Sequence, residues 1–217
     1  MRLAGTRSWR FAVDAGDLLH LALRVRDGAR LQVPDAADVP PPLSTPPAPV
    51  SVDLDRESAG AEWLSWWREL VALEGRRHLL RPDQVSERWG TVTRRLRAEQ
   101  TALADPPRFA ALRGRGGVYA AARAVGPGPR RSVDRALQAA RGGRDVIDWA
   151  IVNSAVQAVA AETGADLYSL NGCALVLLVR GSWWQQVSPG VVLASLDAAA
   201  DPSTADALVR AALRTAL

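Results

Sequence analysis

The stretch CALVLLVRGSWWQQVSPGVVLASL, residues 173–196, decides the fold because two apolar runs flank a polar segment and a turn signal. Residues 173–179 do not alternate between apolar and polar side chains, so we expect a central strand that is covered on both faces. Ser188-Pro189-Gly190 predicts a turn into a further strand at 191–196. The C-terminal part of the chain is therefore expected to contain a buried sheet.

The residues around this stretch predict a third strand and two helices. Asn171-Gly172 favours a two-residue hairpin turn, which would pair residues 166–170 with the apolar run that follows. Asp145 and Gly164 are typical of the two ends of a helix, and Asp201-Pro202 is typical of the start of a last amphipathic helix. Residues 146–217 are thus expected to run helix, three strands, helix.

Near the N-terminus, residues 9–13 and 19–25 alternate between larger apolar side chains and other residues, which is the period of half-buried strands. Asp27-Gly28 marks a turn before a further short run, and we predict an antiparallel meander over residues 8–34. Residues 35–52 follow as a proline-rich connector, because proline lacks the amide donor and restricts φ.

Residues 55–145 are predicted to be a helical, basic middle region. Trp63, Trp66 and Trp67 fall on one stripe of a helix and are expected in the core, with Gly75 as its end. Asp105-Pro106 is expected to begin another helix. We therefore predict an α+β fold in a single domain, residues 1–217, and leave open whether the N-terminal and C-terminal strands share one sheet.

The composition indicates a globular protein with an unusual basic side-chain content. The 217 residues include 27 basic residues, all arginine, and the net charge is only +4 although the pI is about 10.4. Abundant Ala and Arg without Lys is typical of a GC-rich, bacterial-like coding sequence. No apolar run is long enough for a membrane span and residues 1–17 lack a signal-peptide core, so we expect a soluble cytoplasmic protein without membrane contact.

No catalytic constellation stands out in the sequence. Cys173 has no histidine close to it in the chain and is expected to be a small packing residue. His20 and His78 are far apart, and one cysteine with two distant histidines gives no metal site. We predict no catalytic residue, no metal and no cofactor, and leave open an enzyme whose site is assembled from distant loops; a pocket lined by ionisable groups with perturbed pKa values would favour it.

Trp183, Trp184 and Arg180 are the first candidate binding residues. Successive residues of an extended segment point to opposite sides, so the two tryptophans cannot both face one core. Either both rings cover the local core, or one packs inward and the other anchors a partner beside Arg180. The resulting hypothesis is a non-enzymatic interaction module, such as an adaptor, chaperone or assembly subunit, that binds an acidic protein partner.

The arginines of the middle region are the second candidate. Residues 63–145 hold 17 of the 27 arginines, many of them around glycine- and proline-rich loops. Guanidinium groups suit phosphate and carboxylate, so the alternative hypothesis is nucleic-acid binding, with a solvated or partner-facing basic surface as the simpler explanation. The residues predicted for polyanion or partner binding are Arg113, Arg115, Arg130, Arg131, Arg141 and Arg144.

Overall fold

A computed structural model describes residues 9–80, 89–127 and 145–216 of the chain and shows an α+β fold. Its centre is a four-stranded sheet in the order β1-β2-β4-β3. The strands are β1 (Arg10–Asp14), β2 (Asn171–Leu177), β3 (Trp184–Ser188) and β4 (Val191–Ser195). The predicted fold class is confirmed, and the N-terminal and C-terminal strands belong to one sheet.

The two central strands are the most buried part of the sheet. β1, β2 and β4 run parallel, and β3 pairs antiparallel with β4. Every residue of β2 and β4 is buried, as expected for parallel strands that are covered on both faces. The prediction of a central strand over residues 173–179 is confirmed, although the strand begins two residues earlier and ends at Leu177.

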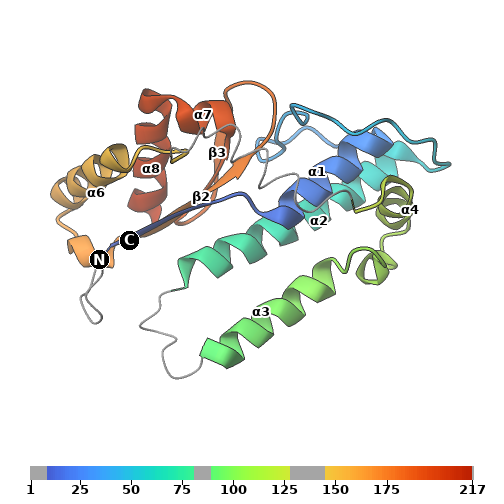
Figure 1. Ribbon diagram of the computed structural model, residues 1–217, viewed down its shortest axis with the longest axis horizontal. Coiled ribbons are helices and arrows are strands. Elements are labelled where there is room, and N and C mark those ends of the chain that lie inside the picture. Colours follow the sequence, from blue (N-terminus) through green and yellow to red (C-terminus); the bar gives the residue numbers. More distant parts are fainter. Residues whose placement is uncertain (1–8, 81–88, 128–144, 217) are drawn as a thin grey trace.

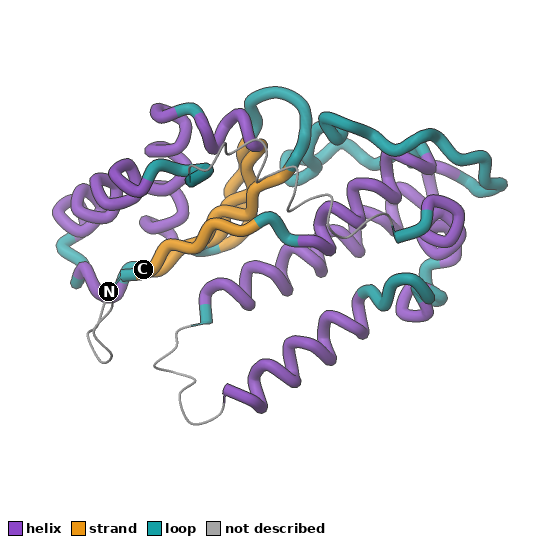
Figure 2. The backbone as a smooth tube through the Cα atoms, in the orientation of Figure 1, coloured by secondary structure: helices purple, strands orange, loops and turns teal. Residues whose placement is uncertain are grey.

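Helices cover the sheet in two groups (Figures 1 and 2). One group comprises α1 (Asp17–Ala29), α2 (Arg56–Leu79), α3 (Trp89–Leu103) and α4 (Gly116–Val125), and the other comprises α6 (Trp149–Thr163), α7 (Leu196–Ala200) and α8 (Pro202–Thr215). Two hydrophobic clusters lie between the helices and the two faces of the sheet. No helix among the described residues is both long and apolar enough to span a bilayer.

Local end signals of the C-terminal helices agree with the structure. Asp201 caps α8 by accepting a hydrogen bond from the Thr204 amide, and Pro202 occupies the first turn. Gly164 ends α6 with a left-handed φ of 67°. The other end of α6 is capped by Asp148 rather than by the predicted Asp145.

The predicted meander over residues 8–34 is wrong beyond its first strand. Gly16 ends β1 with a positive φ of 53°, and residues 17–29 then form helix α1. Ten of the thirteen residues of α1 are buried, so its apolar side chains surround most of the helix. A segment with this many apolar residues fits both the two-residue period of a strand and the 3.6-residue period of a helix. Here the helix is favoured because it packs against α2 and α4.

The predicted hairpin at Asn171-Gly172 is also wrong. A short 3-10 helix, η3 (Leu167–Ser169), precedes β2, and the neighbour of β2 on that side is β1 from the N-terminus. The prediction missed β3, which uses the segment with the two tryptophans and the turn at 188–190 to pair with β4. A parallel partner far away in the sequence leaves no local signal.

Two predicted helix boundaries in the middle region need correction. α2 continues past Gly75 to Leu79, and the absent side chain at Gly75 leaves room for Val191 of β4. Asp105 is followed by a turn and by the 3-10 helix η2 (Ala110–Leu112) instead of an α-helix. Trp63, Trp66 and Trp67 are fully buried as predicted.

The proline-rich connector forms an extended segment along the first helical group, as predicted. Residues 30–55 contain no helix or named strand, only an isolated bridge between Leu43 and Val179. Arg26 of α1 donates hydrogen bonds to the carbonyl oxygens of Pro40 and Pro41, at 2.6 and 2.9 Å. These bonds satisfy carbonyl groups that a proline-rich segment cannot pair within itself.

Candidate functional site

A pocket of about 560 Å³ opens at the carboxyl end of β1, between α2 and α3. We call it the β1 cleft. The start of α1 forms one wall, because the chain leaves β1 through Gly16 and turns directly into the helix. The polar residues that line the β1 cleft are Arg10, Asp14, Asp17, Glu74, Arg77, His78, Thr93, Arg97 and Gln100.

Three ionisable side chains of the β1 cleft contact one another. Glu74 and His78 are four residues apart on α2 and therefore share one face of the helix. The Nε2 atom of His78 lies 2.9 Å from an oxygen of Asp14 and 3.8 Å from an oxygen of Glu74. The Nε2 atom is buried, and Asp14 is its nearer carboxyl neighbour.

The two carboxyl groups of this cluster have pKa values shifted in opposite directions. Contact with the imidazole of His78 lowers the pKa of Asp14, which also accepts a hydrogen bond from the amide of Ala15. Burial raises the pKa of Glu74, whose side chain is only 2% exposed, and the nearby Arg77 and His78 oppose this rise. Carboxyl groups with divergent pKa values beside a histidine are typical of sites that transfer protons.

Three arginines surround the cluster, and they differ in how far they are engaged. Arg77 donates to Glu74 at 3.2 Å, and Arg10 donates to the carbonyl oxygen of Leu80 just after the end of α2. Arg97 projects from α3, and its guanidinium has no hydrogen bond or ion pair with another described residue. Among the described arginines that line the β1 cleft, Arg97 is thus the one available to a ligand.

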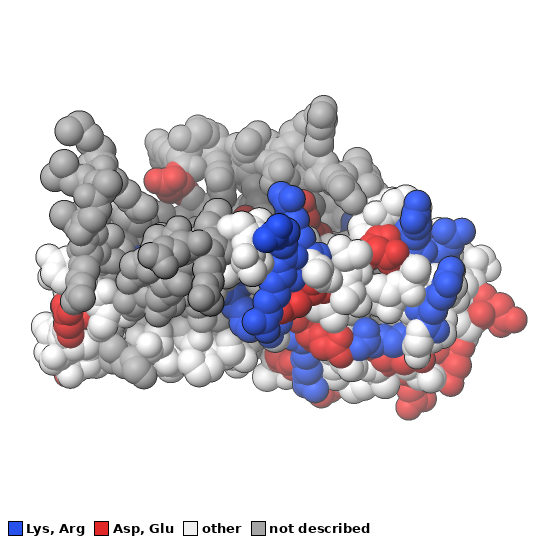
Figure 3. Space-filling model, turned by 90° about the horizontal axis from the view of Figure 1, so that it is seen from below, with Lys and Arg blue, Asp and Glu red and all other residues white. Residues whose placement is uncertain are grey.

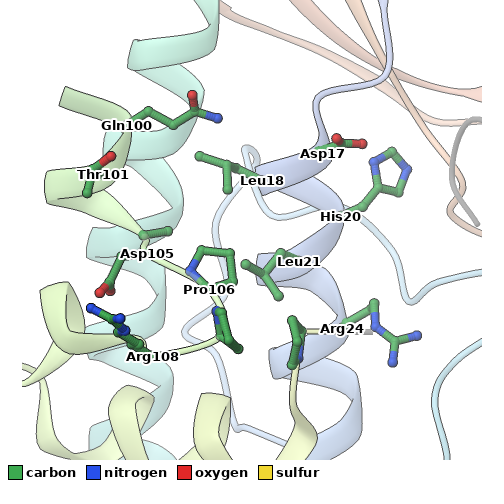
Figure 4. Close-up of a pocket in the computed structure, with 13 residues that line it drawn as sticks. Asp17, Leu18, His20, Leu21, Arg24, Gln100, Thr101, Asp105, Pro106 and Arg108 are labelled. Carbon is green, nitrogen blue, oxygen red and sulfur yellow. The ribbon is translucent and has the colours of Figure 1, made fainter. Parts of the chain in front are cut away.

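A second pocket of about 510 Å³ continues from the β1 cleft along α1 (Figure 4). We call it the α1 groove. Both pockets are lined by Asp17 and Gln100, so they adjoin. Figure 4 shows Leu18 and Leu21 of α1 facing α3 and Pro106 across the groove.

His20 also lines the α1 groove, but its ring is engaged by the backbone. The Nε2 atom accepts a hydrogen bond from the amide of Leu178 at 3.1 Å, so this nitrogen carries no proton. The Nδ1 atom therefore carries the proton and donates it to the carbonyl oxygen of Gly16 at 3.2 Å. His20 connects α1 to the end of β2 as a neutral ring.

Cys173 lies on β2 under α2 and is fully buried. Burial raises the pKa of its thiol to about 12, which keeps it protonated. A protonated buried thiol is a packing residue, as predicted. In the described part of the chain, no group of three or more His, Cys, Asp or Glu side chains is arranged to hold a metal ion.

The predicted partner-binding residues lie in or just before β3, the edge strand opposite β1, and none of them lines the β1 cleft. Trp183 packs against the cluster under α1 and α2, and Trp184 packs against the cluster under α6 and α8. Both rings are half-buried, which matches the expectation that they point to opposite sides. Arg180 is exposed, and its amide donates to the carbonyl oxygen of Pro42 at 2.9 Å. Their role in partner binding stays a prediction.

The structure describes two of the six arginines predicted to bind a polyanion. Arg113 is exposed, whereas Arg115 forms an ion pair with Glu69 of α2. Viewed from the side of α3, arginines form a band with acidic side chains next to it (Figure 3). Arg130, Arg131, Arg141 and Arg144 lie outside the described residues.

Comparisons with protein-family models, with curated proteins and with solved structures find no match. The candidate site therefore rests on geometry. Sequence reasoning missed Asp14, Glu74, His78 and Arg97 as a site, because three separate elements contribute them. The only local signal is the four-residue spacing of Glu74 and His78 on a predicted helix.

The raised pKa of Glu74 predicts a specific pH dependence of stability. The folded protein holds the Glu74 proton more tightly than the unfolded chain, so this group destabilises the fold as the pH rises through its folded pKa. Glu74→Gln should therefore raise the free energy of unfolding near neutral pH. The difference in stability between this variant and the wild type should vanish below about pH 4.5, the ordinary pKa of a glutamate side chain. Urea unfolding across this pH range measures the effect.

Glu99→Gln is the matched control for Glu74→Gln. Arg95 and Arg76 lower the pKa of Glu99, so its removal should reduce stability near neutral pH, in the opposite direction. A Glu74→Gln variant that is less stable than the wild type at neutral pH would contradict the assignment of Glu74 as a desolvated carboxyl group.

Proposed function

We propose that the protein binds a small organic anion in the β1 cleft and that His78 exchanges a proton with the bound molecule. The observation that carries this proposal is the arrangement of His78 between Asp14 and Glu74, in a pocket that Arg97 also lines. A pocket with convergent ionisable groups and shifted pKa values favours a functional site over a solvated surface.

The charge distribution of the β1 cleft favours an anionic ligand. Asp14 faces His78, and Glu74 faces Arg77, so these groups largely compensate one another. Asp17 stands in the first turn of α1, where a carboxylate complements the positive end of the helix dipole. The guanidinium of Arg97 is left to pair with the carboxylate or phosphate group of a ligand.

The surroundings of His78 suit acid and base chemistry. Asp14 lies 2.9 Å from the Nε2 atom and restricts the orientation of the ring. The Nε2 atom is buried and faces Asp14, so the ring and this carboxyl group form one unit at the wall of the β1 cleft. Glu74 lies within 3.8 Å of the same nitrogen and supplies a second carboxyl group with a different proton affinity.

Acetate binding to the full-length protein tests the proposal. We expect acetate to shift the ring NMR signals of His78 in a saturable way, while His20, the only other histidine, serves as an internal reference. Arg97→Ala should weaken acetate binding about tenfold, because a hydrogen bond to a charged group contributes about 1.5 kcal/mol or more.

Arg94→Ala is the matched control for Arg97→Ala. Arg94 is exposed on the same helix, has no ion pair among the described residues and does not line the β1 cleft. Arg94→Ala and Arg97→Ala each remove one positive charge from α3, so a general loss of positive potential would weaken acetate binding in both variants. Equal losses in both, or unchanged His78 signals at saturating acetate, would disprove the proposed site.

A second proposal is the interaction module that binds an acidic protein partner. The observation in its favour is that β3 pairs only with β4 in the described sheet, which leaves its other edge for an added strand beside Arg180. Affinity capture from two halves of one lysate, of which one is treated with nuclease, separates this proposal from the alternative of nucleic-acid binding. A stoichiometric protein that survives nuclease supports the first, and co-purified nucleic acid supports the second.

A further inference from the structure

The β1 cleft and the α1 groove form one continuous path between α1 and α3. Asp17 and Gln100 line both pockets, and they stand on opposite sides of the path, on α1 and α3 respectively. A ligand held at Arg97 and His78 can therefore extend past these two residues into the groove. The polarity of the side chains that line the groove then determines which chemical group can extend into it.

Polar and apolar side chains both line the α1 groove, and the apolar ones include two leucines of α1. Leu18 and Leu21 are each 6% exposed and Ala104 is 3% exposed, so they contribute a narrow apolar strip. Pro106, Pro107 and Pro127 add apolar surface that offers no amide donor. A hydrocarbon chain that lies along this strip would gain from leaving water.

Charged groups mark the far end of the groove and limit its apolar length. Arg24 and Arg108 both line it, and Figure 4 places them beyond Leu21 as seen from Asp17 and Gln100. Asp105 is engaged by the amide of Ala111 at 2.9 Å. From Asp17 to Arg24 the helix rises about 10 Å, so the apolar part holds a chain of moderate length.

We propose that the ligand is a straight-chain carboxylate of medium length, with its carboxylate in the β1 cleft and its chain in the α1 groove. This inference rests on the proposed anion site and specifies its substrate class. Charge and shape agree with it, because Arg97, which is unpaired among the described residues, stands at one end of the path and a strip of apolar side chains lies along α1.

A chain-length series tests the inference on the full-length protein. The probes are acetate, butyrate, hexanoate and octanoate, with affinities measured by calorimetry. Each methylene buried in the groove should raise affinity about fourfold, which corresponds to about 0.8 kcal/mol. The gain should end once the chain reaches Arg24 and Arg108.

Thr101→Trp should block the groove without disturbing the core. Thr101 is exposed on α3 and lines the α1 groove, so a large side chain there should abolish the gain with chain length and leave acetate binding unchanged. Ala102→Trp is the matched control, because Ala102 is exposed on the same helix and does not line the groove. The thermal midpoint of both variants confirms that they fold.

The outcomes separate the inference from the function on which it rests. Absence of acetate binding would overturn the proposed anion site itself. Acetate binding with the same affinity for octanoate would overturn the inference and leave the anion site standing. A gain with chain length that survives Thr101→Trp would place the chain elsewhere and also overturn the inference.

Discussion

Trp63→Ala is expected to lower the free energy of unfolding by about 3–5 kcal/mol, because it removes a large, fully buried aromatic ring from the core. Trp63 stacks on Trp67 with ring centroids 5.4 Å apart, and the guanidinium of Arg26 lies 5.4 Å from the Trp63 ring. Its indole nitrogen also donates to the carbonyl oxygen of Ala22 at 2.7 Å, which joins α2 to α1. Urea unfolding followed by circular dichroism measures the loss.

Two further variants separate the contributions at Trp63. Trp63→Phe keeps an aromatic ring but removes the indole hydrogen bond to the Ala22 carbonyl and part of the buried ring, so it should cost about 1–3 kcal/mol. Trp149→Ala removes a tryptophan that is 45% exposed and should cost much less than Trp63→Ala. A Trp63→Ala protein as stable as Trp149→Ala would show that α2 does not pack in the core as described.

Gly60→Ala is expected to destabilise the protein by about 3 kcal/mol although alanine is the better helix former. A Cβ atom at position 60 would lie 2.0 Å from the carbonyl oxygen of Gln32. The obstacle is backbone, and the amide of Gln32 is bonded to the carbonyl oxygen of Arg56 in the same helix. The segment after α1 would have to move away from α2, and chemical denaturation would report the loss.

Gly90→Ala is the control for this prediction. Gly90 lies in α3, and nothing lies within 4 Å of a Cβ built there. The same substitution should stabilise the protein by up to about 1 kcal/mol through helix propensity alone. Equal effects at positions 60 and 90 would contradict the close approach of the Gln32 backbone to α2.

Several elements could be predicted because their signals are local. The apolar run of β2, the stripe of tryptophans on α2 and the cap of Asp201 on α8 each depend on residues within a few positions. α1 could not be assigned in this way, since its dense apolar residues fit two periods. β1 and β2 could not be paired either, because their parallel register joins the two ends of the chain.

The candidate site was outside the reach of local reasoning. His78 lies near the end of α2, but nothing in the sequence brings Asp14 of β1 beside it or Arg97 of α3 into the same pocket. Trp183 and Trp184 are candidate binding residues because adjacent tryptophans are unusual in a strand connection. In the structure each of them packs against a hydrophobic cluster of the core. The sequence shows which residues are unusual, whereas a functional site depends on the distances between side chains in the folded protein.

The sequence by itself determined the α+β class, the buried central strand, the tryptophan core of α2 and the start of the last helix. Periodicity, helix caps and proline content depend on residues that are close together in the chain, so they can be recognised without a structure. The tertiary structure alone decided that residues 17–29 are helical, that β1 joins the C-terminal strands and that Asp14, Glu74 and His78 meet. These outcomes depend on long-range contacts, such as the hydrogen bond between Leu178 and His20 across 158 residues, which no local pattern encodes.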